Sequence, residues 1–137
     1  MLVDGAGVIY ESAIIDEYLE EKFPEVQLMP TDLLLRAKAR IWIDFMSSRI
    51  HTAASDINHE RNLDKAIAKM AEHLRTIDEA IAGKKFLVGD RYSLADITFI
   101  PFYTRRERYK TAIDDNYPNL RSWAESLIAR PQVAATL

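Results

Sequence analysis

Hydrophobic residues recur at helical spacing along most of the chain, and the clearest stripe lies between residues 63 and 82. Apolar positions there alternate by four and three, so they share one face of a helix: Leu63, Ile67, Met70, Leu74, Ile77 and Ile81. A single apolar face is typical of a helix at the edge of a bundle, with its other faces in solvent. Gly83 predicts the end of this helix, because glycine readily adopts the left-handed conformation that closes one.

The segment from residue 32 to about 58 predicts a long helix with two apolar faces. One face carries Leu34, Ala37, Ile41 and Phe45, and the other carries Leu35, Ala39, Trp42 and Met46. Two apolar faces need two packing partners. We therefore expect a helical bundle on one side of this helix and a partner subunit or a cleft on the other.

A third helical segment, from about residue 94 to 109, is apolar on nearly every face. Such a helix belongs in the middle of a domain rather than on its surface. Pro101 lies inside it and predicts a kink, because proline removes one backbone hydrogen bond. Pro118 is expected to start the last helix at its first position, and Pro131 to end that helix.

The start of the central helix carries two overlapping signals. Ser93 is placed as the N-cap, and Asp96, three residues later, can return a carboxylate to the N–H of Ser93. Tyr92 and Ile97 occupy the positions of a hydrophobic staple around this capping box. We interpret these four residues as a structural capping motif, and the helix that they open as the folding centre.

The first 31 residues follow a different pattern. Residues 1–10 predict two short strands around a glycine-rich turn, and a helix then runs from Glu11 to about Phe23, where Pro24 stops it. The stretch that follows has no periodicity, so we interpret it as a connector. The expected organisation is a hairpin with a helix (1–24), a linker (25–31) and an all-α domain (32–137).

Composition narrows the classes of partner. The net charge is −3, from 18 basic and 21 acidic residues, so neither nucleic acid nor an anionic membrane is expected as a partner. The absence of cysteine excludes disulfides, thiolate metal ligands and a cysteine nucleophile within these 137 residues. No signal-peptide pattern and no membrane-spanning stretch are visible, so we expect a cytoplasmic protein.

Self-association is expected from the same patterns. Two strands alone are only marginally stable in water, so the hairpin needs further strands, a helix or a partner chain. The second apolar face of the long helix needs a partner as well. A homodimer is the simplest prediction.

Few side chains are arranged for chemistry. The three histidines, His51, His59 and His73, share no ligand spacing with one another or with a carboxylate pair, so no metal site is predicted. Basic residues gather between 105 and 110 beside two tyrosines, which indicates either an anion-binding patch or the solvated end of a helix. Glu107 interrupts this cluster, which favours the second interpretation. No catalytic residue is predicted within the chain.

Several motifs, in their order, carry a family resemblance. Glu11-Ser12 opens a helix, and a free helix N-terminus beside a serine hydroxyl is suited to hold a carboxylate. Gly89-Asp90 and the capping motif precede the central helix, and Tyr117-Pro118-Asn119-Leu120 with Trp123 opens the last one. This series resembles the cytosolic glutathione transferases, from the end of their thioredoxin-like domain through their C-terminal helical domain.

The resemblance implies a fold and a set of site residues. The fold would be the all-α helical bundle of the glutathione S-transferase C-terminal domain, with a short hairpin and a helix left from a thioredoxin-like domain. Glu11 and Ser12 would hold the γ-glutamyl end of glutathione, which is a substrate in this family, and no metal would be needed. A site for a small hydrophobic electrophile would be lined by Trp42, Phe45, Phe99 and Tyr103, although core packing is an alternative role for each.

The resemblance also implies that the family's activating Ser, Tyr or Cys, and its cis-proline, would precede Met1. We therefore expect the C-terminal portion of an enzyme that conjugates glutathione to small electrophiles, inactive by itself and weak in glutathione binding. The run from Leu28 to Arg36 resembles bacterial members, including the stringent-starvation-protein branch. A second hypothesis is a non-catalytic interaction or dimerisation module, as some family members serve in transcription or translation complexes.

Overall fold

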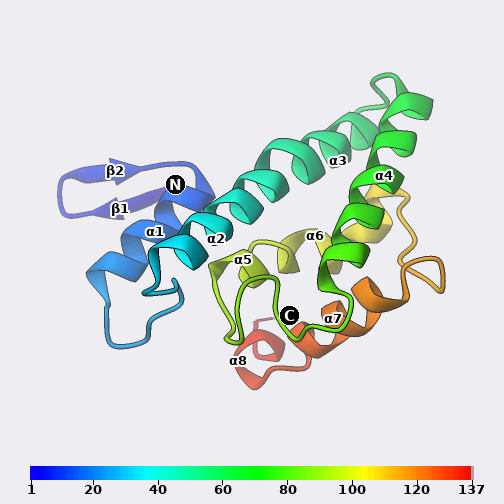
Figure 1. Ribbon diagram of the computed structural model, residues 1–137. Coiled ribbons are helices and arrows are strands. Elements are labelled where there is room, and N and C mark those ends of the chain that lie inside the picture. Colours follow the sequence, from blue (N-terminus) through cyan, green and yellow to red (C-terminus); the bar gives the residue numbers. More distant parts are fainter. Residues whose placement is uncertain (137) are drawn as a thin grey trace.

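The predicted long helix is present as three consecutive elements that cross the molecule (Figure 1). In the computed structural model, which describes residues 1–136, α2 (Leu33–Phe45) leads through a π-helical turn (Met46–Ile50) into α3 (His51–Asn58). A π turn widens the helix locally and shifts the direction of the side chains that follow it. The sequence pattern did not predict this turn.

One of the two predicted faces of this long helix is buried, and the other is not. Ala39 and Met46 of the second face lie in the core, together with Ile43. On the first face, Leu34 and Ile41 are 64% and 66% exposed. Residues 1–136 therefore supply a packing partner for only one apolar face of α2.

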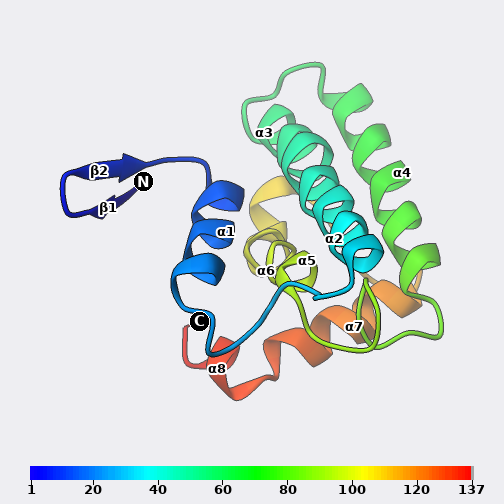
Figure 2. The ribbon, with the colours of Figure 1, turned by 60° about the vertical axis from the view of Figure 1, so that its left-hand side comes forward.

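The edge helix α4 (Leu63–Ile81) runs back beside α3 after a polar turn (Figures 1 and 2). Its predicted stripe is buried at Met70, Leu74, Ile77 and Ile81. The prediction for Ile67 is wrong, because this side chain is 43% exposed and the neighbouring Ala66 is buried in its place. One position corresponds to 100° of helix rotation, which suffices to turn Ile67 out of the contact with α3. Gly83, with φ of +71°, closes the helix as predicted.

The central helix is interrupted rather than continuous. It divides into α5 (Leu94–Ile97), α6 (Ile100–Thr104) and a 3₁₀ turn (Arg106–Tyr109). Pro101 has no N–H, and in a continuous helix its ring would clash with the carbonyl of Ile97. The predicted kink is therefore a break in the hydrogen-bond ladder. Phe99 and Phe102 are almost completely buried, which confirms the predicted place of this segment in the core.

The last long helix, α7 (Pro118–Ile128), begins at the predicted proline. Its inner face packs Trp123 against Phe99, with ring centroids 5.0 Å apart. The expectation that Pro131 ends this helix is wrong, because α7 already ends at Ile128. Pro131 is instead the first residue of the short helix α8 (Pro131–Ala134), a position that suits the fixed φ of proline.

The N-terminal segment forms the predicted hairpin and helix at one side of the bundle (Figure 2). β1 (Leu2–Asp4) pairs antiparallel with β2 (Gly7–Ile9), and α1 (Ser12–Lys22) follows. Tyr18 and Lys22 of α1 bind the carboxylate of Asp4, which joins the helix to the hairpin. No residue of α1 is buried, so this unit adds little to the core.

The connector between α1 and α2 is irregular, as predicted, but it is anchored. The carboxylate of Glu20 accepts the N–H groups of Leu28 and Met29 at 2.9 and 2.8 Å. The carbonyl of Leu28 in turn accepts the N–H of Leu94 at 3.0 Å. These bonds tie α1 to the start of α5. The assignment of residues 25–31 as a boundary between two domains stays a prediction.

The predicted capping box forms at the start of α5. One carboxylate oxygen of Asp96 accepts both the N–H and the hydroxyl of Ser93, at 2.9 and 3.1 Å. Its other oxygen accepts the N–H of Leu87 at 2.9 Å, from the loop that precedes the helix. Tyr92 and Ile97 both pack, partly buried, against the core. The cap therefore fixes a loop as well as a helix terminus.

We expect Asp96→Ala to lower the free energy of unfolding by about 3 kcal/mol, because it leaves two buried N–H groups without an acceptor. Ser93→Ala should cost less, about 0.5–2 kcal/mol, since it removes one hydroxyl from the cap. The measurement is urea denaturation. Ser47→Ala, at an exposed position in the long helix, is the matched control. Equal midpoints for the wild type and both cap variants would contradict this account.

Candidate functional site

The strongest site feature is the first turn of α1. The carbonyl of Glu11 accepts the N–H groups of Ile14 and Ile15 at 3.1 and 2.9 Å, whereas the N–H groups of Ser12 and Ala13 meet no acceptor within residues 1–136. The hydroxyl of Ser12 is exposed beside them. Two free N–H groups and a hydroxyl at the positive end of a helix dipole form a suitable cradle for a carboxylate.

Glu11 holds an unusual backbone conformation at this point. Its φ of +69° lies in the left-handed half of the Ramachandran map, which a residue other than glycine adopts at a cost of about 1–3 kcal/mol. Backbone strain of this kind concentrates at ligand-binding sites. Here it places an exposed carboxylate directly before the cradle, where a ligand's ammonium group could meet it.

A cleft of about 530 Å³ opens beside Ser12. Its walls come from α3, which contributes His51 and Asn58, and from α6 and the 3₁₀ turn, which contribute Phe102, Arg105 and Tyr109. The cleft therefore joins residues from three separate parts of the chain. The sequence pattern did not identify His51 or Arg105 as neighbours of Ser12, because only the tertiary fold brings them together.

The electrostatics of this cleft combine one cation with a neutral ring. Burial lowers the pKa of His51, and the nearby guanidinium of Arg105 lowers it further. The imidazole is therefore neutral at pH 7 and can both donate and accept a hydrogen bond. Arg105 forms no ion pair with any residue from 1 to 136, which leaves its charge available to a ligand.

The four aromatic residues predicted for an electrophile site form two separate pairs. Trp42 meets Phe45 edge to face at 5.3 Å, and Phe45 continues to His73 at 5.6 Å. Phe99 lies 6.1 Å from Tyr103, and both are buried in the core. None of the four lines the cleft beside Ser12. Their role at an electrophile site stays a prediction.

The basic cluster between residues 105 and 110 does not act as one patch. Arg106 stacks on the ring of Tyr103 at 4.4 Å and donates to its carbonyl. Lys110 pairs with Glu60 at 3.5 Å. Only Arg105 lines the cleft.

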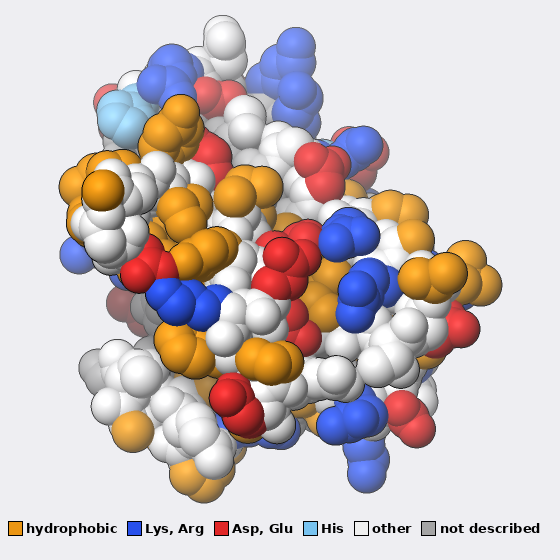
Figure 3. Space-filling view, turned by 90° about the vertical axis from the view of Figure 1, so that its left-hand side faces the viewer, with side chains coloured by type: hydrophobic (Ala, Val, Ile, Leu, Met, Phe, Trp, Pro, Cys, Tyr) orange, Lys and Arg blue, Asp and Glu red, His pale blue; other side chains and the backbone are white. Residues whose placement is uncertain are grey.

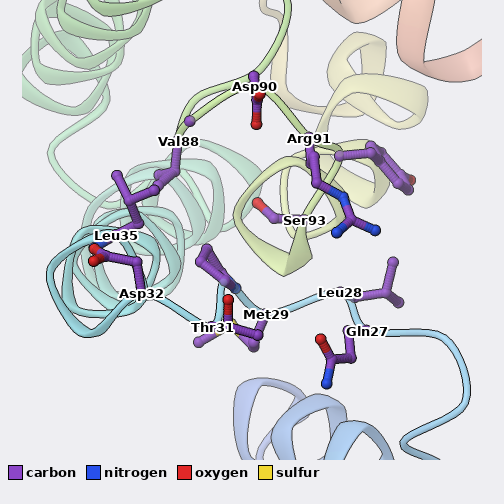
Figure 4. A pocket seen from close by; sticks show the side chains of 13 residues that line it. Gln27, Leu28, Met29, Thr31, Asp32, Leu35, Val88, Asp90, Arg91 and Ser93 are labelled. Atoms are coloured by element: carbon purple, nitrogen blue, oxygen red, sulfur yellow. The ribbon is translucent and has the colours of Figure 1, made fainter.

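A smaller pocket, of about 160 Å³, lies between the connector and the loop before α5 (Figure 4). Met29 and Thr31 border it on one side, and Asp90, Arg91 and Ser93 on the other. This is the junction at which the connector is bonded to Leu94, so we interpret the pocket as part of that structural joint rather than as a ligand site.

Two further kinds of site are absent from the part of the chain that is described. It contains no group of three His, Asp or Glu side chains placed to share a metal ion. None of its helices combines the length and the apolar character that crossing a bilayer would take.

Comparison with known proteins identifies relatives along the whole chain. The family described as "Glutathione S-transferase, C-terminal domain" matches residues 42–131. Glutathione S-transferase U19 of Arabidopsis thaliana is 27% identical over 144 residues, and a probable glutathione S-transferase of Nicotiana tabacum is 28% identical over 144. Both alignments cover 100% of this chain, which spans 66% and 65% of the two relatives' own lengths.

Solved structures share the fold. A glutathione S-transferase of Methylobacterium radiotolerans, in complex with glutathione sulfonate, superimposes with a TM-score of 0.85 at 27% identity, covering 98% of this chain and 68% of that one. Ure2p in complex with glutathione superimposes with a TM-score of 0.81 at 19% identity, covering 94% and 69%. The second likeness concerns the fold alone.

We expect Arg105→Gln to raise the pKa of His51 part of the way toward its ordinary value of 6.5, because burial, the larger cause, remains. Protonation of His51 opposes folding in the wild type, so its effect is a loss of stability as pH falls from 6.5 through the lowered pKa. In Arg105→Gln the pKa of His51 lies closer to 6.5, so stability should be lost over a narrower range of pH. Ring-proton NMR titration measures the pKa directly.

His73 serves as an internal control, since burial lowers its pKa too but Arg105 is not among the causes. Arg108→Gln, at an exposed position of the same turn, is the matched variant and should leave the pKa of His51 unchanged. An unaltered His51 titration in Arg105→Gln would show that the guanidinium does not act on this ring.

Proposed function

The chain belongs to the glutathione S-transferase family, and on this premise we propose that it is the C-terminal portion of an enzyme that conjugates glutathione to small electrophiles. The observation that carries the proposal is the cradle at Ser12, with its two free N–H groups, opening directly onto a cleft. The chain spans about two thirds of the length of its curated relatives, so the activity of the whole protein is part of the proposal.

Each group at the start of α1 has a role in this proposal. The hydroxyl of Ser12 and the N–H groups of Ser12 and Ala13 bind the α-carboxylate of the γ-glutamyl group. The carboxylate of Glu11 binds its ammonium. A ligand held at this end extends toward the cleft between α3 and α6, where the electrophile binds near His51 and Arg105.

The four aromatic residues predicted for the electrophile site have an indirect role in this proposal. Phe102 lines the cleft, and its ring lies 5.6 Å from that of Phe99. Phe99 therefore supports the cleft wall from behind, and the ring of Tyr103 lies 6.1 Å from that of Phe99. Trp42 and Phe45, which are half-buried, contact an electrophile only where it extends along α2 to their rings.

We propose that the thiol of glutathione is activated by a thioredoxin-like domain that packs on the N-terminal hairpin and α1. Support comes from the two-stranded sheet, which is too small to be stable by itself, and from the exposed apolar side chains around it. Figure 3 views this face, where hydrophobic side chains lie between acidic and basic ones. The exposed apolar residues of the hairpin, α1 and the connector are Met1, Val3, Val8, Tyr10, Ile14, Phe23 and Val26.

A second candidate function is a dimerisation or interaction module of the same family. The exposed apolar face of α2, with Leu33, Leu34 and Ile41, favours it. A second copy of the chain is the simplest partner, and a homodimer is compatible with the enzymatic proposal as well. We also propose a cytoplasmic location, in keeping with a chain that has no cysteine for disulfides.

We expect the 137-residue chain by itself to bind glutathione weakly, through the γ-glutamyl end alone, and not to conjugate it at a useful rate. Binding at one end leaves the thiol without the orientation on which rate depends. Calorimetry should therefore give γ-glutamylcysteine the same affinity as glutathione, and cysteinylglycine no detectable affinity. Ser12→Ala should weaken binding of both γ-glutamyl ligands, by roughly tenfold for a lost charge-assisted hydrogen bond.

Ser47→Ala, at an exposed serine in the π-helical turn between α2 and α3, is the matched control and should bind like the wild type. Equal binding by Ser12→Ala would remove the cradle from the proposal. Glutathione-dependent turnover of a general aromatic electrophile by the chain alone, at an enzyme-like rate, would show that a thiol activator exists within these residues.

Association should depend on the exposed face of α2. We expect the wild type to form a homodimer, and Ile41→Glu to dissociate it, because a charge buried at an interface without a partner is costly. Sedimentation velocity over a range of concentrations measures this. Ile67→Glu places the same charge on α4, where the side chain is also exposed, and should leave the dimer intact. A wild type that is monomeric at all concentrations would contradict the prediction.

A further inference from the structure

The cleft beside Ser12 has an uncompensated positive charge on its wall. Arg105 lines the cleft, and neither a lysine nor another arginine does. No Asp or Glu is among the lining residues either. Since Arg105 takes part in no ion pair within residues 1–136, a ligand in this cleft meets a cation that the chain itself does not neutralise.

The acidic side chains of the adjoining elements do not supply the missing partner. Asp56 of α3 pairs with Arg61 at 2.9 Å, and Glu60, in the turn after α3, pairs with Lys110 at 3.5 Å. Glu107 belongs to the 3₁₀ turn that packs against α3, but it is not part of the cleft wall. The positive charge of the cleft is therefore not cancelled from α3 or from the turns on either side.

A structural role at the end of α6 does not account for this side chain. Cations are favoured at helix C-termini, where they can bind the last carbonyl groups. Arg106 performs that role, because it donates to the carbonyl of Tyr103 at 2.9 Å and stacks on the same ring. The backbone N–H of Arg105 is fixed on the carbonyl of Phe102 at 3.1 Å, which leaves its guanidinium at a defined place beside the cleft.

The wall next to this cation is aromatic. Phe102 and Tyr109 both line the cleft, and their rings are stacked, with centroids 5.8 Å apart and planes 3° from parallel. Phe102 also contacts Phe99 of the core at 5.6 Å, so the stack is anchored from behind. Arg105 follows Phe102 by three residues and precedes Tyr109 by four. A flat aromatic ligand can pack against such a wall.

The wall contributed by α3 adds polar groups without charge. The neutral ring of His51 and the amide of Asn58 can each donate or accept a hydrogen bond. Neither group repels an anion. The electrostatic preference of the cleft is therefore determined by the guanidinium.

We propose that Arg105 determines the substrate class of this cleft, and that the electrophile is an aromatic molecule that carries a carboxylate. The guanidinium binds the carboxylate, and the stacked rings of Phe102 and Tyr109 contact the aromatic body. This inference rests on the proposed function, because it takes the cleft to be the electrophile site of a glutathione transferase. It adds that the site prefers an anionic electrophile over an uncharged one of the same shape.

A compound of this class is 4-chloro-3-nitrobenzoate. In its conjugation the thiolate of glutathione forms a C–S bond at the carbon that carries chlorine, and chloride leaves with the electron pair of the broken C–Cl bond. Its amide, 4-chloro-3-nitrobenzamide, has the same ring and leaving group but no charge. The two compounds therefore separate recognition of the carboxylate from recognition of the ring.

The test measures binding of each compound to the 137-residue chain at pH 7, at constant ionic strength and without glutathione, so that no bond is formed or broken. The ring signals of His51 and His73 are followed by NMR, with His51→Gln to assign them. His73 does not line the cleft and is the internal reference. We expect both compounds to shift the His51 signal saturably, and the benzoate to bind about fivefold or more tightly than the benzamide, as one partly solvated charge interaction allows.

Three variants examine the guanidinium itself. Arg105→Gln should reduce the preference for the benzoate to about one, with the affinity for the benzamide unchanged. Arg105→Lys retains the charge and should keep part of the preference. Arg108→Gln removes an exposed charge from the same turn outside the cleft and should bind both compounds like the wild type. Circular dichroism checks that all three variants fold.

Four results would each overturn the inference. Equal affinity of the wild type for both compounds would exclude a charge preference and leave the cleft as an electrophile site. An equal loss in Arg105→Gln and Arg108→Gln would indicate a general charge effect. If Arg105→Gln weakened glutathione but not γ-glutamylcysteine, the guanidinium would serve the glycyl carboxylate instead. If neither compound shifted His51, the cleft would not be the electrophile site, whereas glutathione binding at Ser12 is measured separately by calorimetry.

Discussion

The buried carboxylate of Asp96 is the interaction on which the position of the cleft beside Ser12 depends. Burial raises its pKa, and the hydrogen bonds from Leu87 and Ser93 oppose that rise by favouring the ionised form. The carboxylate thus joins the loop after α4 to the start of α5. The helical segments that follow carry Phe102 and Arg105 into the cleft.

A second chain of hydrogen bonds sets the position of Ser12 relative to that cleft. Glu20 of α1 binds the connector, and the connector carbonyl at Leu28 binds Leu94 at the start of α5. Glu17 adds a bidentate pair with Arg40 of α2, which lowers the pKa of Glu17 through the hydrogen bonds it accepts. No residue of α1 is fully buried and only Ala13 of this helix packs against the core, so these polar contacts contribute much of what determines where the cradle points.

Signals that act within a few residues were readable from the sequence. The capping box at Ser93, the turn at Gly83 and the helix start at Pro118 each depend on local backbone chemistry, and each was confirmed. The kink at Pro101 is a local signal of the same kind, whereas the outward turn of Ile67 depends on how α4 packs against α3, which periodicity does not encode. The same limit applies to the cleft: Ser12, His51 and Arg105 are far apart in sequence, and no motif connects them.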